Sequence, residues 1–252
     1  MPRRLQLKKG NQDNQMKIIA YYNGVELGSC NYTWLDPTAY KSARSFTFKD
    51  FIITNPAVID NSGHSFINIS VYITNVYGLV VELNKIKIVP LVDTDFTKND
   101  NIEVYGTILP DWFVDVYDQA IIDVFYFWDH DTVPDFPAVP LSLYKESGLR
   151  ARGIFSGLPK QLRSGEIVIN ASTIIDEFDF YEALAVNLVS EKGFMGSCYN
   201  SLADCLIESY DKNYSAKLIF KNGKQLNNVL GADFLDDIIT LFGQYNITLH
   251  LL

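Results

Sequence analysis

The stretch GFMGSCYNSLADCLIESYD, Gly193–Asp211, decides how the C-terminal third of the chain is interpreted. Its middle part, residues 199–210, has the periodicity of an amphipathic helix with 3.6 residues per turn. The positions expected to face the core are Tyr199, Leu202, Leu206 and Ser209. The polar positions recur every three or four residues and form an outward stripe: Asn200, Asp204, Glu208 and Asp211. The stretch therefore predicts a helix with one buried face and one exposed acidic face.

The loop before this helix places two large apolar side chains, Phe194 and Met195, between Gly193 and Gly196. We expect these side chains to be exposed, because little else in the loop can shield them. An aromatic loop beside an acidic helix face is typical of a docking surface, since the ring supplies buried area and the carboxylates pair with Arg or Lys. An ordinary amphipathic helix with a solvated polar face is the alternative.

The two cysteines of this stretch, Cys198 and Cys205, lie seven residues apart. Structural zinc sites pair cysteines at closer spacing and need four ligands. Cys205 lies between apolar positions and is expected to be a small buried residue. The chain has 3 cysteines in all, an odd number, so no disulfide framework is predicted and a reducing, cytoplasmic setting fits.

Residues 166–252 alternate between strand and helix patterns. Strands are predicted at EIVIN (166–170), AKLIFKN (216–222) and NITLHLL (246–252). Besides residues 199–210, helices are predicted from Asp179 as the capping residue to about 190, and from 231 to Gly243. This alternation predicts an α/β domain around a three-stranded parallel sheet.

Residues 16–157 read as a β-rich domain, either a sandwich or a barrel. MKIIAYYNG predicts a hairpin at Asn-Gly, and SFTFKDFIIT, SFINISVYITNVYG, LVVELNKIKIVPLV and IEVYGTIL predict further strands. Residues 112–131 fit either two strands or a buried helix. Residues 158–165 are expected to be a linker and residues 1–15 a flexible arm. The sequence thus predicts an α+β chain of two domains.

The negative charge is uneven along the chain. The net charge is −9, and from Glu166 onward 12 acidic residues outnumber 5 basic ones. This acidity argues against nucleic-acid binding and favours either a solvated acidic surface that aids solubility or a basic partner. No apolar run reaches the roughly 18 residues that a membrane span needs, so no membrane association is expected.

At this point the motifs show a family resemblance. Residues 166–252 resemble barstar, the intracellular inhibitor of the ribonuclease barnase, most clearly at FMGSCYNSLADCLIE and at the LADCL segment, Leu202–Leu206. The terminal ITLHLL resembles the last strand of that family. The resemblance implies an α/β inhibitor domain whose helix and preceding loop enter the basic cleft of a nuclease.

The resemblance also implies roles for individual residues. Asp204 matches the family's central acidic residue, and Phe194, Met195 and Gly196 match its loop. Two positions depart from the family, since Asn200 stands where it has an acid and Ala203 where it has a tryptophan. With Glu208 and Asp211, these residues are the expected partner-binding site: Phe194, Met195, Gly196, Asn200, Asp204, Glu208 and Asp211.

The resemblance implies a cytoplasmic bacterial immunity protein, not an enzyme, that needs no cofactor or metal. Its expected partner is a basic nuclease toxin, in the first place a ribonuclease, bound in a 1:1 complex. Two alternatives stay open. One is a metal-dependent hydrolase in the β-rich domain, using Asp129, His130 and Asp131 in WDHDTVPD. The other is an adaptor whose barstar-like domain no longer inhibits.

Overall fold

The chain divides into two compact units, residues 1–138 and 139–252. The computed structural model describes residues 16–35, 43–109, 118–130 and 141–252. The expected arm, residues 1–15, lies outside the described residues. That the two units are independent domains stays a prediction, and each unit is described below by itself.

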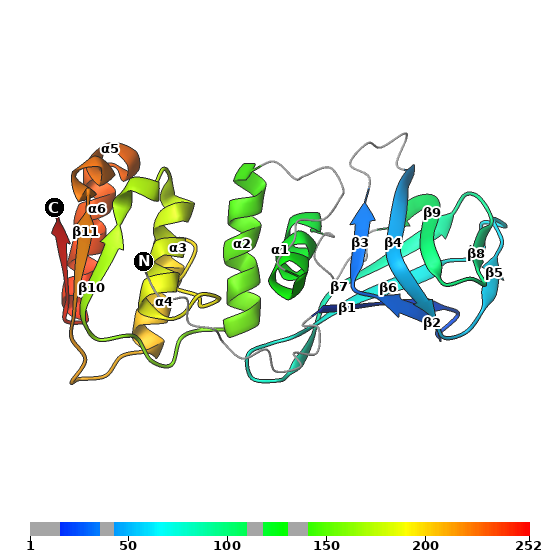
Figure 1. Ribbon diagram of the computed structural model, residues 1–252, viewed down its shortest axis with the longest axis horizontal. Coiled ribbons are helices and arrows are strands. Elements are labelled where there is room, and N and C mark those ends of the chain that lie inside the picture. Colours follow the sequence, from blue (N-terminus) through cyan, green and yellow to red (C-terminus); the bar gives the residue numbers. More distant parts are fainter. Residues whose placement is uncertain (1–15, 36–42, 110–117, 131–140) are drawn as a thin grey trace, which may run out of the picture. The chain divides into compact units, whose positions relative to one another are not determined.

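The first unit is built mainly from strands (Figure 1). Its described elements are β1 (Met16–Tyr22), β2 (Val25–Cys30), β3 (Tyr32–Leu35), β4 (Ala43–Ile53), β5 (Ala57–Ile59), β6 (Ile67–Thr74), β7 (Val80–Pro90), β8 (Thr94–Phe96), β9 (Asp100–Leu109) and α1 (Gln119–His130). The β1–β2 hairpin turns at Asn23 and Gly24, both with positive φ, as the Asn-Gly signal predicts.

Six of these strands close into an antiparallel β-barrel. The order is β2-β1-β6-β7-β9-β4, and pairing of β2 with β4 completes the ring. β3 pairs with β4 beyond this closure point. Gly28 allows β2 to approach β4, since a Cβ there would lie 2.2 Å from the carbonyl oxygen of Ile52. The barrel alternative of the predicted β-rich fold is therefore confirmed.

The barrel interior is filled by side chains from alternate positions of its strands. On β6 the buried positions are Ile67, Ile69, Val71 and Ile73. On β4 the buried rings of Phe46, Phe48 and Phe51 pack edge to face. The register of β4 against β9 shifts between Phe48 and Phe51, which keeps all three rings on the inner side. The predicted strands at SFTFKDFIIT and SFINISVYITNVYG thus supply much of this core.

Residues 119–130 form helix α1, so a strand at residues 121–127 is wrong and the helix alternative is confirmed there. The first of the two possible strands, near Val114 and Val116, lies outside the described residues. Asp118 accepts a hydrogen bond from the Ile121 N–H (3.2 Å), which satisfies a free donor at the helix start. The buried Asp123 carboxylate anchors the helix, because its Oδ1 accepts from Tyr32 Oη on β3 (2.9 Å) and from Gln119 Nε2 (2.9 Å).

The second unit alternates strands and helices. Its elements are α2 (Leu141–Ser156), β10 (Gly165–Asn170), the 3-10 turn η1 (Ala171–Thr173), α3 (Glu177–Leu188), α4 (Tyr199–Glu208), β11 (Ala216–Lys221), the 3-10 turn η2 (Gly223–Gln225), α5 (Leu226–Leu230), α6 (Ala232–Gln244) and β12 (Ile247–Leu251). The predicted three-stranded parallel sheet is confirmed, with the order β10-β11-β12.

One face of this sheet carries the core of the unit. Ile169, Leu218 and Phe220 are buried in one apolar cluster with residues of α3, α4 and α6. The opposite face is more open, since Val168 and His250 are exposed. The cap of α3 differs from the prediction, because Asp176 occupies the N-cap and accepts from the Asp179 N–H (2.9 Å).

Residues 141–156 were included in the predicted β-rich domain with no helix assigned, but they form helix α2 and group with the second unit. Lys145 Nζ lies 2.8 Å from carboxylate oxygens of both Asp176 and Asp179. Arg152, which is buried, pairs with Glu182 on α3 (Nη2–Oε1 2.5 Å) and donates to the Glu191 carbonyl. The second unit thus begins before the expected linker, residues 158–165.

Candidate functional site

The start of helix α4 is held in a tight turn. Gly196 has φ +90°, and a Cβ on it would lie 2.5 Å from the Leu202 backbone nitrogen. Ser201 Oγ accepts hydrogen bonds from the N–H groups of Ser197 (2.7 Å) and Cys198 (3.0 Å). Cys198 occupies the N-cap. This reciprocal capping fixes where the helix begins and hence which residues face outward.

The inner face of α4 contains Leu202, Cys205 and Leu206, all buried, and Ser209 is buried just after the helix. Tyr199 was expected on this face, but its side chain is 39% exposed and that prediction is wrong. Tyr199 is the first residue of α4, so no preceding helical turn lies beside its side chain.

The outer face of α4 carries Asn200, Asp204 and Glu208, all exposed. Successive members are four residues apart, a rise of about 6 Å along the helix axis. In the described part of the chain, neither the Asp204 nor the Glu208 carboxylate has a hydrogen-bond or ion-pair partner. Ile207 lies on the same side of the helix with 60% of its side chain exposed. The face therefore combines unpaired carboxylates with apolar surface.

The loop before α4 is less open than predicted. Met195 is completely buried in the core cluster, so its expected exposure is wrong. Phe194 is partly buried, and its ring lies against Gly153 of α2, with Cε2 3.3 Å from where a Gly153 Cβ would be. Helix α2 covers the loop, which the sequence prediction could not include because it assigned no helix to residues 141–156.

Asp211 lies outside α4, which ends at Glu208 with Ser209 as C-cap. Its Oδ1 accepts from the Asn213 N–H (2.9 Å), a local turn that orients the carboxylate. Asp211 is exposed and follows the last helical residue, Glu208, by three positions. Tyr210 is also exposed, and its ring packs edge to face on Tyr245.

The cysteines have contrasting environments. Hydrogen bonds from the Ser201 side chain and backbone lower the pKa of the exposed Cys198 thiol. Cys205 is buried, as predicted, and burial raises the pKa of its thiol to about 12. Among the residues that the structure describes, no three His, Cys, Asp or Glu side chains are grouped to hold a metal ion.

The structure describes only part of WDHDTVPD, the segment of the alternative metal-dependent hydrolase site. Asp129 Oδ2 accepts from the Met16 N–H (3.2 Å). The His130 ring stacks on Tyr126 (4.2 Å between centroids), and its Nδ1 lies 3.0 Å from the Tyr126 carbonyl oxygen. Asp131 lies outside the described residues. Asp129 thus contacts β1, whereas the contacts of His130 are to Tyr126 in its own helix α1.

Sequence reasoning missed the exposed apolar residues of the α4 face. Ile207 follows Leu206, and the hydropathy pattern alone assigns both to an apolar run. Helical geometry separates them, because consecutive positions are about 100° apart on a helix. A helical-wheel projection of residues 199–210 would have placed Ile207 on the same side as the acidic stripe.

Comparisons of the chain with protein-family models, with curated proteins and with solved structures gave no match. In the described residues, no helix has the length and apolar character required to cross a membrane.

Proposed function

We propose that the second unit is an inhibitor module of the barstar type and that the chain is an immunity protein. Its partner is a basic nuclease toxin, in the first place a ribonuclease, held in a 1:1 complex. The observation that carries the proposal is the outer face of α4, where the carboxylates of Asp204 and Glu208 are exposed and have no partner among the described residues.

Inhibition follows from the chemistry of nuclease active sites. A site that cleaves a phosphodiester must attract phosphate, so it presents Arg and Lys side chains. A carboxylate held rigidly on a helix competes for those cations and forms charge-assisted hydrogen bonds with them. Asp204, at the middle of the face, occupies the place of a substrate phosphate, and the helix blocks the cleft.

Apolar contacts beside the carboxylates supply the remaining affinity. Ile207 and Tyr199 are exposed next to the acidic stripe and can be desolvated by the partner. Met195 supports this face from the core and is not expected to contact the partner through its side chain. Asn200 donates and accepts hydrogen bonds without charge, so Asp204 and Glu208 carry the ionic contacts.

The proposal is tested by expressing the chain with candidate nuclease toxins and measuring growth and co-purification. The wild-type chain is expected to restore growth and to purify with its toxin at equal stoichiometry. Asp204→Ala is expected to lose protection while remaining folded, because Asp204 is exposed and unpaired in the described structure. Fluorogenic RNA cleavage by the purified toxin then reports inhibition directly.

Glu146→Ala provides the matched control, since Glu146 is an exposed acid on helix α2. It removes the same charge from another helix and is expected to leave protection unchanged. Equal protection by wild-type and Asp204→Ala chains would refute the proposed surface. Co-purification without inhibition would instead identify the chain as an adaptor.

A further inference from the structure

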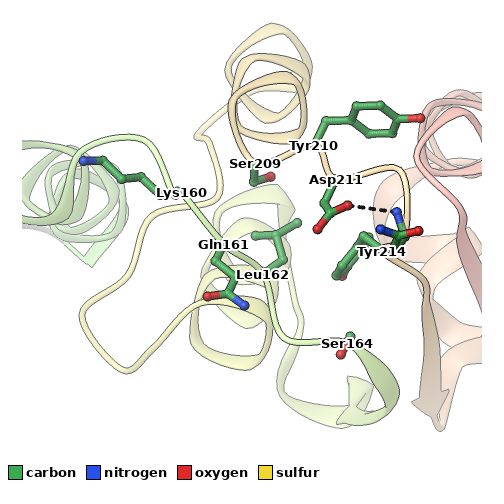
Figure 2. Close-up of a pocket in the computed structure, with 9 residues that line it drawn as sticks. Lys160, Gln161, Leu162, Ser164, Ser209, Tyr210, Asp211 and Tyr214 are labelled. Atoms are coloured by element: carbon green, nitrogen blue, oxygen red, sulfur yellow. Dashed lines mark hydrogen bonds between the residues drawn. The ribbon is translucent and has the colours of Figure 1, made fainter.

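A cavity of about 320 Å³ opens at the C-terminal end of α4, between residues 160–164 and residues 209–214 (Figure 2). This volume is at the lower end of the range for ligand pockets. Its wall includes Gln161, Ser164, Ser209, Asp211 and Tyr214. The cavity lining is mostly polar. It shares Asp211 with the expected partner-binding residues, and its other residues lie outside the outer face of α4.

The cavity has the electrostatic character of a cation site. Helix α4 ends at Glu208, so the partial negative charge of its C-terminus lies beside the cavity. The Asp211 carboxylate is part of the wall, and its turn with Asn213 holds it in place. Lys160 is the cationic residue of the lining, and its side chain extends away from Asp211 (Figure 2).

The shape of the wall favours a planar cation. Tyr214 donates a hydrogen bond through its hydroxyl to the Arg163 carbonyl (2.9 Å), so its ring is held as part of the wall. A guanidinium group stacks on an aromatic ring and binds a carboxylate through two parallel N–H groups. The Gln161 and Ser164 side chains offer additional oxygen acceptors. An ammonium group would use the carboxylate but would gain less from the ring.

We propose that this cavity binds an arginine side chain of the protein partner, as a second anchor beside the contact at Asp204. This inference rests on the proposed function for the identity of the partner. Asp204 lies four residues before the end of α4, about 6 Å along the helix axis. A basic surface that covers α4 can therefore place one cation at Asp204 and another in the cavity.

The first test uses a ligand in place of the partner. Nα-acetyl-arginine amide and its uncharged citrulline analogue are titrated into the full chain, which is labelled with 15N. The arginine compound is expected to shift the amide resonances of Ser209, Asp211 and Tyr214, and the citrulline compound is not. Asp211→Asn is expected to weaken arginine binding at least fivefold. Equal shifts with both compounds, or an unchanged affinity in Asp211→Asn, would overturn the proposal.

Asp211→Asn is conservative, because the asparagine oxygen can still accept from the Asn213 N–H. Asp95→Asn is the matched control, since Asp95 is also exposed and its Oδ1 accepts from the Thr97 N–H two residues on (2.8 Å). The control is expected to bind arginine amide as the wild type does. An equal loss in the control would show a non-specific charge effect and contradict the cavity assignment.

The second test uses the toxin complex. Asp211→Asn is expected to raise the dissociation constant about tenfold, while Asp95→Asn leaves it unchanged. If Asp204→Ala weakens the complex and Asp211→Asn does not, the arginine anchor is wrong and the docking face stands. If neither substitution has an effect, the proposed function fails, and the ligand titration still decides whether the cavity binds arginine.

Discussion

At the residue scale, the site depends on Gly196, whose left-handed conformation turns the chain into α4. Its φ of +90° and the short distance from its missing Cβ to the Leu202 nitrogen leave no space for a side chain. The turn then allows Ser201 to cap the helix and Met195 to enter the core. One small residue thus sets the direction of the acidic face.

Gly196→Ala is expected to lower the free energy of unfolding by about 2–4 kcal/mol, from the strained φ and the clash with backbone. Urea denaturation followed by circular dichroism measures this change. Gly148→Ala is the control, because Gly148 lies in α2 and an added Cβ meets nothing within 4 Å. The control should be neutral or stabilising by about 0.5–1 kcal/mol. Similar losses in both variants would contradict this account.

The buried Asp123 makes the stability of the barrel unit depend on pH. Burial raises the pKa of its carboxyl group, although hydrogen bonds from Gln119 and Tyr32 oppose the shift. A folded-state pKa above the unfolded value means that the folded state binds the proton more tightly. Stability from this group is therefore present at low pH and is lost as the pH rises through the folded-state pKa.

Asp123→Asn removes this pH dependence and keeps an oxygen that accepts from Tyr32 and Gln119. The unfolding free energy of the variant is expected to exceed that of the wild type by an amount that grows from about pH 4 upward and then levels off. Urea titrations at several pH values measure the difference. A difference that is constant with pH, or that shrinks as the pH rises, would be inconsistent with a raised pKa.

At the element scale, strands and helices could be predicted from the sequence where their apolar residues recur at the same spacing as their buried positions. The strands at Ile67–Thr74 and Ala216–Lys221 and helix α6 follow that pattern, and so does the parallel sheet. Helix α2 was missed, since Arg152 and Lys145 on its inner side are polar and bury their charges in ion pairs. Polar residues that pack inward give no hydropathy signal. Neither helix α2 nor its contact with Phe194 could therefore be predicted from the sequence.

Helix α2 should be part of the stable inhibitor module. Leu149 of α2 and Leu162, from the segment predicted as a linker, are both buried in the core of the second unit. A fragment of residues 139–252 is expected to unfold cooperatively, and a fragment of residues 166–252 to be less stable by about 2–5 kcal/mol or more. Thermal and urea unfolding of both fragments measure this. Equal stability would show that α2 adds nothing to the module.

At the scale of the whole molecule, the proposed function predicts that charge controls how the complex forms. Residues from Glu166 onward hold most of the net charge of −9, and the acidic face of α4 lies among them. Such a concentration steers a basic partner toward the docking face over a distance set by the ionic strength. This steering depends on the charge of the second unit and needs no contribution from the barrel unit.

The association rate constant with the nuclease is therefore expected to fall about tenfold or more between 10 mM and 500 mM salt. Stopped-flow fluorescence measures the rate at each salt concentration. The dissociation rate constant should change much less, because the docked pairs are shielded from solvent. An association rate that does not respond to salt would contradict electrostatic steering by the second unit.

The proposed function requires that Asp204 binds the cationic centre of a nuclease active site. Its most direct test is the dissociation constant of the toxin complex for the wild type, Asp204→Asn and the control Glu146→Gln. Loss of one partner of a desolvated charge pair costs about 2–5 kcal/mol, so Asp204→Asn should raise the constant at least about 30-fold. Glu146→Gln should leave it unchanged. A change of less than about twofold in Asp204→Asn would contradict the claim.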